Sequence, residues 1–246
     1  MSARSVDPKQ AAVEVGKGRP QAQARRFLGP IALAGLILFI ADAWVVQTQG
    51  FNTFDRAVEL FVQGFPWGPV VYVFAAINWL AGYYQVGFGL LVGVAFFAWD
   101  RRAGWLILIG SGASLIDNLI KLSFQRQRPS ADLVQILAPA SGYSFPSGHA
   151  VFFTWLSVMV ASALAPKIHP RLRPMLWTAA LLVILATSLA RVYGGAHWPT
   201  DVLGGLLLGL SWAGFVLWLP ERWLPTPKRT WLRFQPRGER PAKWGS

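Results

Sequence analysis

Apolar residues gather in blocks of about twenty along this 246-residue chain. A helix of about twenty mostly apolar residues is long enough to cross the ~30 Å hydrocarbon core of a bilayer. Transmembrane β-strands would instead appear as ~10-residue segments of alternating polarity, which these blocks are not. Charged residues make up only 14% of the chain. The pattern predicts an all-α fold, a polytopic helical bundle in a membrane.

Six blocks are long enough to be spans. They cover residues 27–47, 82–99, 105–124, 147–165, 175–193 and 199–219. After the first block, residues 54–62 alternate polar and apolar side chains at helical spacing, as an interfacial helix would. Residues 67–81 are apolar but short, and the sequence leaves open whether they enter the bilayer.

We expect three parts in the chain. Residues 1–26 are polar and basic, and they predict a disordered tail. Residues 27–219 form the six-span membrane domain, and residues 220–246 form a second basic tail.

The distribution of positive charge predicts the topology. Eighteen of the 23 Lys and Arg residues lie in the two tails and in the turns at residues 100–104 and 167–174. Because cytoplasmic segments carry an excess of Lys and Arg, we expect both termini in the cytoplasm. The opposite loops then lie on the extracytoplasmic side of an inner (plasma) membrane.

The net charge of +12 follows from this bias and from attraction to anionic lipid headgroups. Since no nucleic-acid-binding motif accompanies the charge, we expect no nucleic-acid partner. The chain has no cysteine, which excludes disulfides, thiolate metal sites and a cysteine nucleophile.

Three polar clusters lie on the predicted extracytoplasmic side. In one, Arg191-x5-His197-x3-Asp201 stands between two apolar spans, where charged residues are costly and usually functional. Pro199 suits the first turn of a helix that starts near Trp198. Asp201 would then lie one turn below His197 and could accept a hydrogen bond from its ring, making the other nitrogen a better nucleophile or base. Arg191 is a planar cation suited to a phosphate or a carboxylate.

A second cluster is Lys121-x6-Arg128-Pro129. A lysine at a helix end and an arginine seven residues later can bracket an anion, and Pro129 fixes the backbone directly after the arginine. Asp117 lies one helical turn before Lys121. We therefore expect Asp117 to help position the lysine.

The third cluster is Pro146-Ser147-Gly148-His149, just before the fourth span. Ser147 fits a helix N-cap. The first N–H groups of that helix, unhindered at Gly148, form an anion site. His149 would lie on the first turn. Together the three clusters supply an anion site, a nucleophile and an acid, which is the combination that phosphoryl transfer needs.

In order and spacing, the clusters match the three-part pattern of the type 2 phosphatidic acid phosphatase superfamily, and the chain resembles that lipid phosphatase family. Related vanadium haloperoxidases and bacterial class A acid phosphatases share the resemblance. The family pattern is Lys-x6-Arg-Pro, then Pro-Ser-Gly-His, then Ser-Arg-x5-His-x3-Asp. Ala190 stands where the family has serine, so we expect altered affinity or pH response rather than inactivity.

The resemblance implies a mechanism. His197 attacks phosphorus and forms a phosphohistidine, Asp201 orients it, and His149 protonates the leaving oxygen and then activates water. The residues alone do not decide which histidine is the nucleophile, although Asp201 favours His197. The groups implied to hold the phosphoryl oxygens are Lys121, Arg128, Ser147, Gly148 and Arg191. Because fixed cations can stabilise the developing charge, we expect no metal and no other cofactor.

A site at the membrane–water boundary predicts a lipid phosphate substrate. An isoprenoid diphosphate such as undecaprenyl diphosphate is favoured for a bacterial host, with phosphatidic acid, phosphatidylglycerophosphate and lipid A phosphates as alternatives. Two other functions remain open: a lipid phosphotransferase, which uses an alcohol instead of water, and an inactive lipid-binding scaffold. His169, in a predicted cytoplasmic turn, is interpreted as a bystander. The sequence leaves the oligomeric state open.

Overall fold

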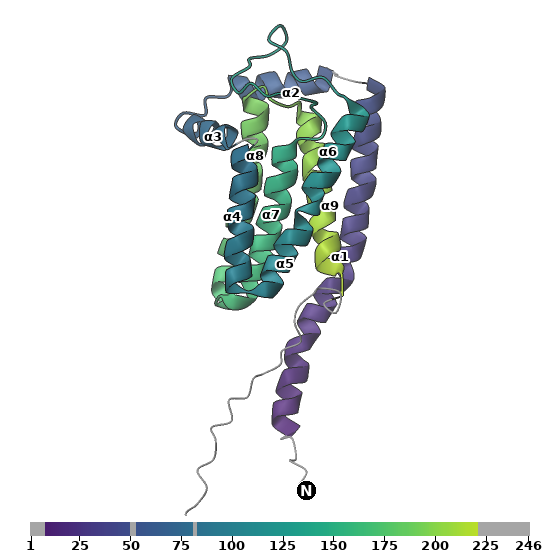
Figure 1. The fold of residues 1–246 in the computed structure, drawn as a ribbon, viewed down its shortest axis with the longest axis vertical. Helices are drawn as coiled ribbons and strands as arrows, with labels where there is room; N and C mark the ends of the chain where they lie inside the picture. Colours follow the sequence, from purple (N-terminus) through teal and green to yellow (C-terminus); the bar gives the residue numbers. More distant parts are fainter. Residues whose placement is uncertain (1–7, 50–52, 81–82, 221–246) are drawn as a thin grey trace, which may run out of the picture.

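The computed structural model describes residues 8–49, 53–80 and 83–220, and within these ranges the chain forms helices, turns and loops without a strand (Figure 1). The helices are α1 (Pro8–Gln49), α2 (Thr53–Gly64), α3 (Val70–Trp79), α4 (Tyr83–Trp99), α5 (Arg101–Gly110), α6 (Gly112–Phe124), α7 (Gly148–Leu164), α8 (Arg173–Tyr193) and α9 (Pro199–Trp218). Two short 3-10 helices, Ala165–Lys167 and Pro170–Leu172, connect α7 to α8.

Five helical stretches of the described chain are long and apolar enough to cross a membrane. They are Arg26–Gln49, Arg101–Phe124, Gly148–Lys167, Pro170–Tyr193 and Pro199–Trp218. A sixth span results if α3 and α4, which meet at an angle of 86°, are counted as one bent span. The prediction of an all-α membrane bundle is confirmed, and large apolar side chains such as Ile37, Leu90 and Leu119 are exposed on its outside.

The first predicted tail differs from the expectation. α1 begins at Pro8, inside the segment 1–26 for which the sequence predicts a disordered tail, and the division of the chain into a tail, a membrane domain and a second tail stays a prediction. The segment combines the good helix formers Ala, Gln, Arg and Lys with the poor ones Gly16, Gly18 and Pro20. Extending the helix of the first span backwards also needs no new nucleation. Residues 1–7 and the second tail beyond residue 220 lie outside the described residues.

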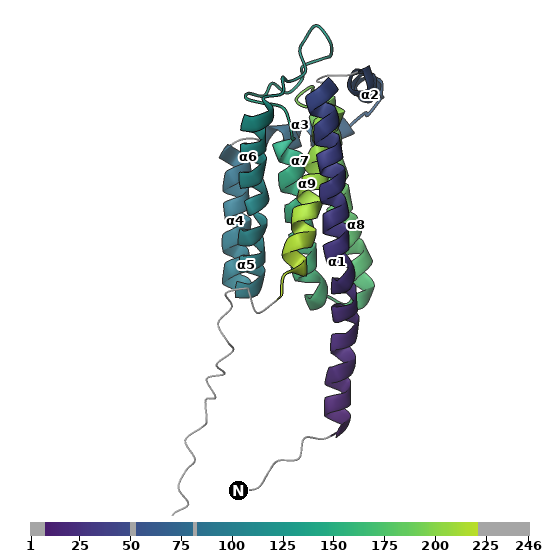
Figure 2. The same ribbon diagram turned by 90° about the vertical axis from the view of Figure 1, so that its right-hand side faces the viewer.

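The centre of the bundle is formed by α7 and α9, the two most buried spans, while α8 packs against α7 and α1 packs along α9 (Figure 2). Two glycines of α9 allow α7 to approach closely. A Cβ at Gly209 would lie 2.8 Å from the Thr154 Cβ atom, and a Cβ at Gly205 would lie 2.7 Å from the Ser147 carbonyl oxygen. This contact brings the first turns of α7 and α9, which carry His149 and Asp201, to the same end of the bundle.

α2 lies across that end of the bundle (Figure 1). Phe54 and Phe61 are exposed, whereas Asp55 and Glu59 are completely buried. The helix thus turns its acidic side toward the protein and its apolar side outward, as an interfacial helix beside lipid would. Burial raises the pKa of Glu59 to about 8, with the nearby Asp201 and Asp55 carboxylates adding to the effect.

Glu59 makes the stability of the fold depend on pH. Its raised pKa means that the folded chain holds this proton between about pH 4.5 and 8 while the unfolded chain does not. The stabilisation is therefore complete below pH 4.5 and is lost as the pH rises to 8. We expect Glu59→Gln to unfold at the same temperature as the wild type near pH 4.5 and at a higher temperature above pH 8.

Thermal unfolding of the detergent-solubilised protein across this pH range measures the effect. Asp132→Asn is the control, because Asp132 is an exposed carboxylate and its removal should leave the pH profile of the wild type intact. A Glu59→Gln profile parallel to that of the wild type would contradict the prediction.

Candidate active site

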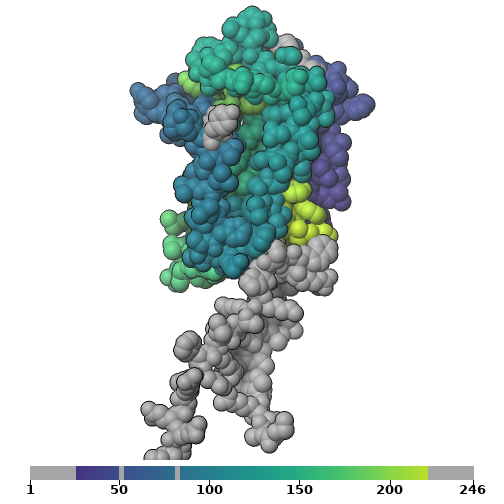
Figure 3. Space-filling view, viewed as in Figure 1, coloured from purple at the N-terminus to yellow at the C-terminus, as the bar shows by residue number. Residues whose placement is uncertain are grey.

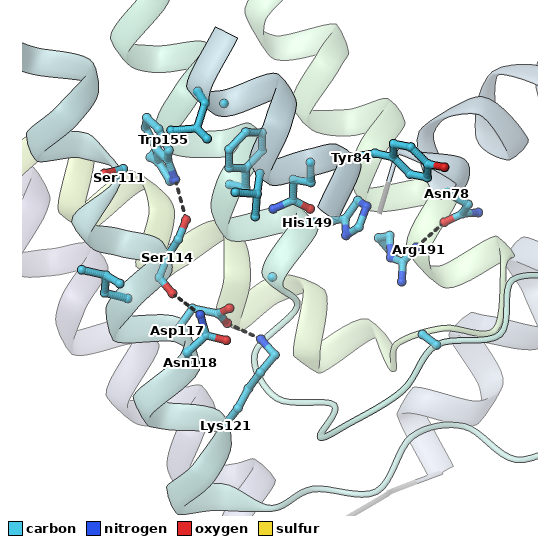
Figure 4. A pocket seen from close by; sticks show the side chains of 18 of the residues that line it. Asn78, Tyr84, Ser111, Ser114, Asp117, Asn118, Lys121, His149, Trp155 and Arg191 are labelled. Atoms are coloured by element: carbon cyan, nitrogen blue, oxygen red, sulfur yellow. Dashed lines mark hydrogen bonds and ion pairs between the residues drawn. The ribbon is translucent and has the colours of Figure 1, made fainter. Parts of the chain in front are cut away.

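A cavity of about 1050 Å³ opens between α4, the α5–α6 span and α7. One end is polar and is lined by most of the residues predicted from the sequence: Lys121, Arg128, Gly148, His149, Arg191 and His197. In Figure 4, His149 lies between Lys121 on one side and Arg191 on the other. The rest of the cavity is largely apolar and follows α4, with Val86, Leu90 and Val94 in its wall. Figure 3 shows the hollow between α4 and α6.

The His197 ring is buried, and its two nitrogens face different groups. Nδ1 lies 2.8 Å from the Ser144 carbonyl oxygen. Because a carbonyl only accepts, Nδ1 carries the hydrogen and Nε2 keeps its lone pair. Nε2 lies 3.0 Å from Arg128 Nη1. Burial, followed by the charge of Arg128, holds the pKa of His197 well below its ordinary value of 6.5. The ring is therefore neutral, with its lone pair on Nε2.

Asp201 does not make the predicted hydrogen bond to His197. Its Oδ2 atom lies 3.7 Å from His197 Nδ1, which is too long, and the backbone carbonyl of Ser144 takes its place. Two other donors hold Oδ2: the Ser144 hydroxyl and the Trp198 N–H, at 2.9 Å for the latter. Asp201 therefore caps α9 and places a negative charge beside the imidazole without contacting it directly.

The second oxygen of Asp201 binds Arg126, which the sequence reasoning did not identify as part of the site. Arg126 Nη1 donates to Asp201 Oδ1 at 2.5 Å and to the Thr200 hydroxyl at 2.7 Å. Its Nη2 donates to Asp55 Oδ2 at 2.6 Å. Asp55 in turn accepts from the backbone N–H of Thr200 at 3.0 Å. A buried ion network thus joins α2, the loop after α6 and the start of α9.

The sequence offered one signal for this network. Arg126 is one of the few cations on the side of the membrane where cations are scarce, but spacing alone could not distinguish it from Arg128, two residues later. Its partner Asp55 is 71 residues away in the chain.

Lys121 is in direct contact with Asp117, as expected if Asp117 positions the lysine. Its ammonium group forms a short ion pair with the Asp117 carboxylate and a 2.5 Å hydrogen bond to the Pro146 carbonyl oxygen. Asp117 and Lys121 both line the cavity. The lysine is therefore held at the start of α7, beside Gly148.

Ser147 differs from the prediction. It is the N-cap residue of α7, but its side chain makes no capping hydrogen bond and does not line the cavity. Its backbone N–H donates to the Asp201 carbonyl oxygen at 2.9 Å, and the close packing of α7 on α9 at Gly205 covers it. Gly148, the first residue of the helix, does line the cavity, and an N–H at this position has no intrahelical partner.

Backbone carbonyls hold Arg128 in place. Nε donates to Gly142 O at 2.9 Å, and Nη2 donates to Ser141 O at 3.0 Å and Tyr143 O at 3.2 Å. Nη1 donates to Ala196 O at 2.5 Å. The guanidinium is thus fixed beside His197 Nε2 by the loop between α6 and α7.

α3 contacts the two remaining site residues. The Asn78 side chain accepts a 2.5 Å hydrogen bond from Arg191 Nη1. His149 Nε2 lies 3.0 Å from the Leu80 carbonyl oxygen, so Nε2 carries the hydrogen and Nδ1 keeps the lone pair. Neither Asn78 nor Leu80 belongs to the clusters found in the sequence.

Taken together, three cations and a helix N-terminus surround a neutral, buried imidazole, with a second imidazole across the cavity. That arrangement suits a phosphoryl group, with one imidazole lone pair, on His197 Nε2, among the cations and a second, on His149 Nδ1, that can exchange a proton. Comparison with known proteins points to the same chemistry: the family model described as the PAP2 superfamily matches residues 102–225. The chain belongs to the PAP2 superfamily. PAP2 phosphatases hydrolyse lipid phosphates, and the match confirms the resemblance found in the sequence.

Similar proteins include a phosphatidylglycerophosphatase B of Bacillus subtilis, 29% identical over 74% of this chain and 89% of that protein. An undecaprenyl-diphosphatase of Sulfolobus acidocaldarius is 38% identical over 30% of this chain and 32% of its own length. The putative undecaprenyl-diphosphatase YbjG of Escherichia coli is 41% identical over 35% of this chain and 41% of its own length.

One solved structure extends the likeness to the fold. The crystal structure of a transmembrane PAP2-type phosphatidylglycerolphosphate phosphatase from Bacillus subtilis gives a TM-score of 0.64 at 26% identity. The match covers 75% of this chain and 93% of that one. The similarity therefore includes most of the membrane bundle as well as the motifs.

Asp117→Asn should weaken phosphate binding. The amide keeps the shape of the carboxylate but removes the charge that anchors Lys121. A hydrogen bond between charged groups is worth about 1.5–3 kcal/mol, so we expect roughly a tenfold or greater loss of activity and of affinity for inorganic phosphate. Ser123→Ala, an exposed position on the same helix, is the control. Wild-type activity and phosphate affinity in Asp117→Asn would refute this positioning role.

Arg126→Lys should destabilise the protein and reduce its activity. Lysine keeps the positive charge but has no planar fork to bridge Asp55 and Asp201. Leaving a buried charge unpaired costs up to about 3–5 kcal/mol. Thermal unfolding and phosphate release measure the two effects. The matched control is Arg56→Lys, at an exposed arginine next to Asp55. The prediction fails if the two variants behave alike.

Proposed function

We propose that the protein is an integral-membrane lipid phosphatase that works through a phosphohistidine on His197 and needs no metal. The observation that carries the proposal is the cavity itself. Its polar end holds Lys121, Arg128 and Arg191, and it continues without a break into an apolar furrow along α4. Such a cavity suits a molecule with a phosphate head and a hydrocarbon tail.

In the first step, the lone pair of His197 Nε2 attacks the terminal phosphorus, and the bond from this phosphorus to the leaving oxygen breaks; the leaving group is the lipid monophosphate for a diphosphate substrate and the lipid alcohol for a monophosphate. Arg128 Nη1, 3.0 Å from Nε2, then donates to an oxygen of the transferred phosphoryl group. The ring becomes positively charged when Nε2 is bonded to phosphorus. The Asp201 carboxylate, 3.7 Å from Nδ1, stabilises that charge through space.

His149 handles the protons in this proposal. It lines the cavity together with His197. For the first step the ring must carry a proton on Nδ1 in addition to the Nε2–H bound to Leu80 O; Nδ1 gives this proton to the leaving oxygen, and in the second step Nδ1 takes a proton back from the attacking water. Water breaks the N–P bond, which releases inorganic phosphate and restores neutral His197. Lys121 and Arg191 hold the phosphoryl oxygens through both steps.

The proposed setting is the outer face of an inner (plasma) membrane. The start of the apolar part of α1 and the end of α9 lie at one end of the bundle, and the site lies at the other (Figure 1). The basic turns at residues 100–104 and 167–174 lie at the end opposite the site. By the positive-inside rule, that end is cytoplasmic.

For the substrate, we favour an isoprenoid diphosphate such as undecaprenyl diphosphate. The apolar part of the cavity is one furrow, bordered by α4 on one side and by Leu108 and Leu115 on the other, and an isoprenoid has a single chain. The names of two relatives that match over shorter stretches, an undecaprenyl-diphosphatase and a putative undecaprenyl-diphosphatase, agree with this choice. Phosphatidylglycerophosphate is the second candidate, since a phosphatidylglycerophosphatase B gives the longer match.

The test is phosphate release by the purified protein in detergent with excess EDTA. Undecaprenyl diphosphate, phosphatidylglycerophosphate and phosphatidic acid are compared as substrates. We expect release that EDTA does not affect, that is fastest with undecaprenyl diphosphate, and that His197→Ala abolishes. The control is His169→Ala, at an exposed histidine in the turn far from the cavity. It should keep wild-type activity.

Other outcomes would change either the proposed mechanism or the proposed function. Release that stops with EDTA would refute the metal-free mechanism. Alkyl phosphate products in the presence of an added alcohol would indicate a phosphotransferase. No release from any of the three lipids by folded protein would favour a lipid-binding scaffold. Trapped ³²P on His149 instead of His197 would reverse the assignment of the nucleophile.

A further inference from the structure

Asn78 lies near the end of α3, where this helix meets the end of α8 and the polar end of the cavity (Figure 4). Its side-chain oxygen accepts from Arg191 Nη1 at 2.5 Å. Its side-chain nitrogen donates to the Ala190 carbonyl oxygen at 3.0 Å. Both partners belong to the motif that carries His197, but Asn78 itself is more than 110 residues away in sequence.

We propose that Asn78 is a positioning residue for phosphate recognition: it fixes the guanidinium of Arg191 in the orientation that meets a phosphoryl oxygen. The proposal rests on the proposed function and deepens it. It makes α3, which lies outside the three motifs, a part of the phosphate site.

Arg191 needs such an anchor. Its side chain is only 3% exposed, and within the described residues its Nε has no hydrogen-bond partner. An arginine side chain has several rotatable bonds and loses rotamer entropy on being fixed. A neighbour that fixes it in advance lowers the cost of binding a ligand. Asn78 is uncharged, so it fixes Arg191 and leaves its positive charge available for the ligand. An aspartate at this position would neutralise that charge.

The hydrogen bond to Ala190 sets the direction of the amide. Because the amide nitrogen donates to a backbone carbonyl, the amide oxygen must face the guanidinium. Ala190 contributes only a methyl group where the family pattern has serine. The polar contact beside Arg191 thus comes from α3 instead of from the preceding residue in the motif.

The surroundings of Asn78 keep it in place. A Cβ at Gly194 would lie 2.9 Å from the Asn78 Nδ2 atom, so the glycine after α8 leaves the room that the amide occupies. Phe74, one turn earlier in α3, is 1% exposed and packs on the Tyr193 ring with 5.4 Å between ring centroids. α3 is therefore seated on the end of α8, which lets a single amide be positioned accurately.

The test compares Asn78→Ala with Gln63→Ala in the full-length, detergent-solubilised protein. Gln63 is a matched control because it also ties a surface helix to the end of α8. Its Nε2 atom donates to the Tyr193 carbonyl oxygen at 3.2 Å, yet it does not contact Arg191. The measurements are kcat and KM for the best lipid substrate, and the inhibition constant of inorganic phosphate.

We expect Asn78→Ala to lower kcat/KM and to raise the inhibition constant of phosphate, each by about ten- to hundredfold. Gln63→Ala should change both by less than about threefold. An inhibition constant does not depend on how much of the sample is folded, so it separates positioning from damage to the fold. Unchanged KM and phosphate inhibition in Asn78→Ala, with only kcat reduced, would overturn the proposal.

A double-mutant cycle tests whether Asn78 acts through Arg191. Lysine at position 191 keeps a charge but lacks the fork that Asn78 holds. Asn78→Ala should therefore have little further effect on phosphate inhibition in an Arg191→Lys background. An effect as large as in the wild type would also overturn the proposal.

Failure of the proposed function can be distinguished from failure of this inference. If the wild type hydrolyses none of the lipids, inorganic phosphate is used as the probe, and its effect on the unfolding temperature is measured. Stabilisation of the wild type by phosphate that is lost in Asn78→Ala but kept in Gln63→Ala supports the inference without any catalysis. Equal stabilisation of all three proteins, or no stabilisation of the wild type, refutes it.

Discussion

The buried guanidinium of Arg126 links the elements on which the site is built. Arg126 is 7% exposed and bridges two completely buried carboxylates, Asp55 from α2 and Asp201 from α9. Charges in such surroundings are tolerated only when they are paired and hydrogen-bonded, and losing one partner costs several kcal/mol. The network therefore fixes how the surface helix α2, the loop after α6 and the first turn of α9 lie relative to one another. The position of His197, directly before α9, depends on all three.

The same network supplies the electrostatics around His197, the proposed nucleophile. Arg126, Ser144 and Trp198 together hold the Asp201 carboxylate as a fixed negative charge close to His197 Nδ1. A backbone carbonyl, rather than this carboxylate, selects the tautomer. The two tasks that a carboxylate often performs together, orienting an imidazole and stabilising its positive form, are thus divided here between Ser144 and Asp201.

The family match begins at residue 102, yet two supports of the site come from earlier in the chain. Asp55 in α2 holds Arg126, and Asn78 in α3 holds Arg191. Both helices lie at the end of the bundle that contains the site, and neither carries a residue of the three motifs. The motifs thus supply the groups proposed to meet the phosphate, and the surface helices fix the orientation of two of the arginines.

The sequence by itself determined the all-α membrane fold, because long apolar blocks leave a bilayer-spanning helix as the only economical structure. It also predicted a site of Lys121, Arg128, His149, Arg191 and His197, which the structure brings to one cavity, since their motifs are local and keep a fixed spacing. Only the tertiary structure decided which groups hold them. Arg126–Asp55 and Arg191–Asn78 join residues 71 and 113 positions apart, and Ser147 is covered by α9 packing on α7. Such contacts depend on how the helices pack against one another. The periodicity of apolar residues along one helix does not predict which side chains of another helix will contact it.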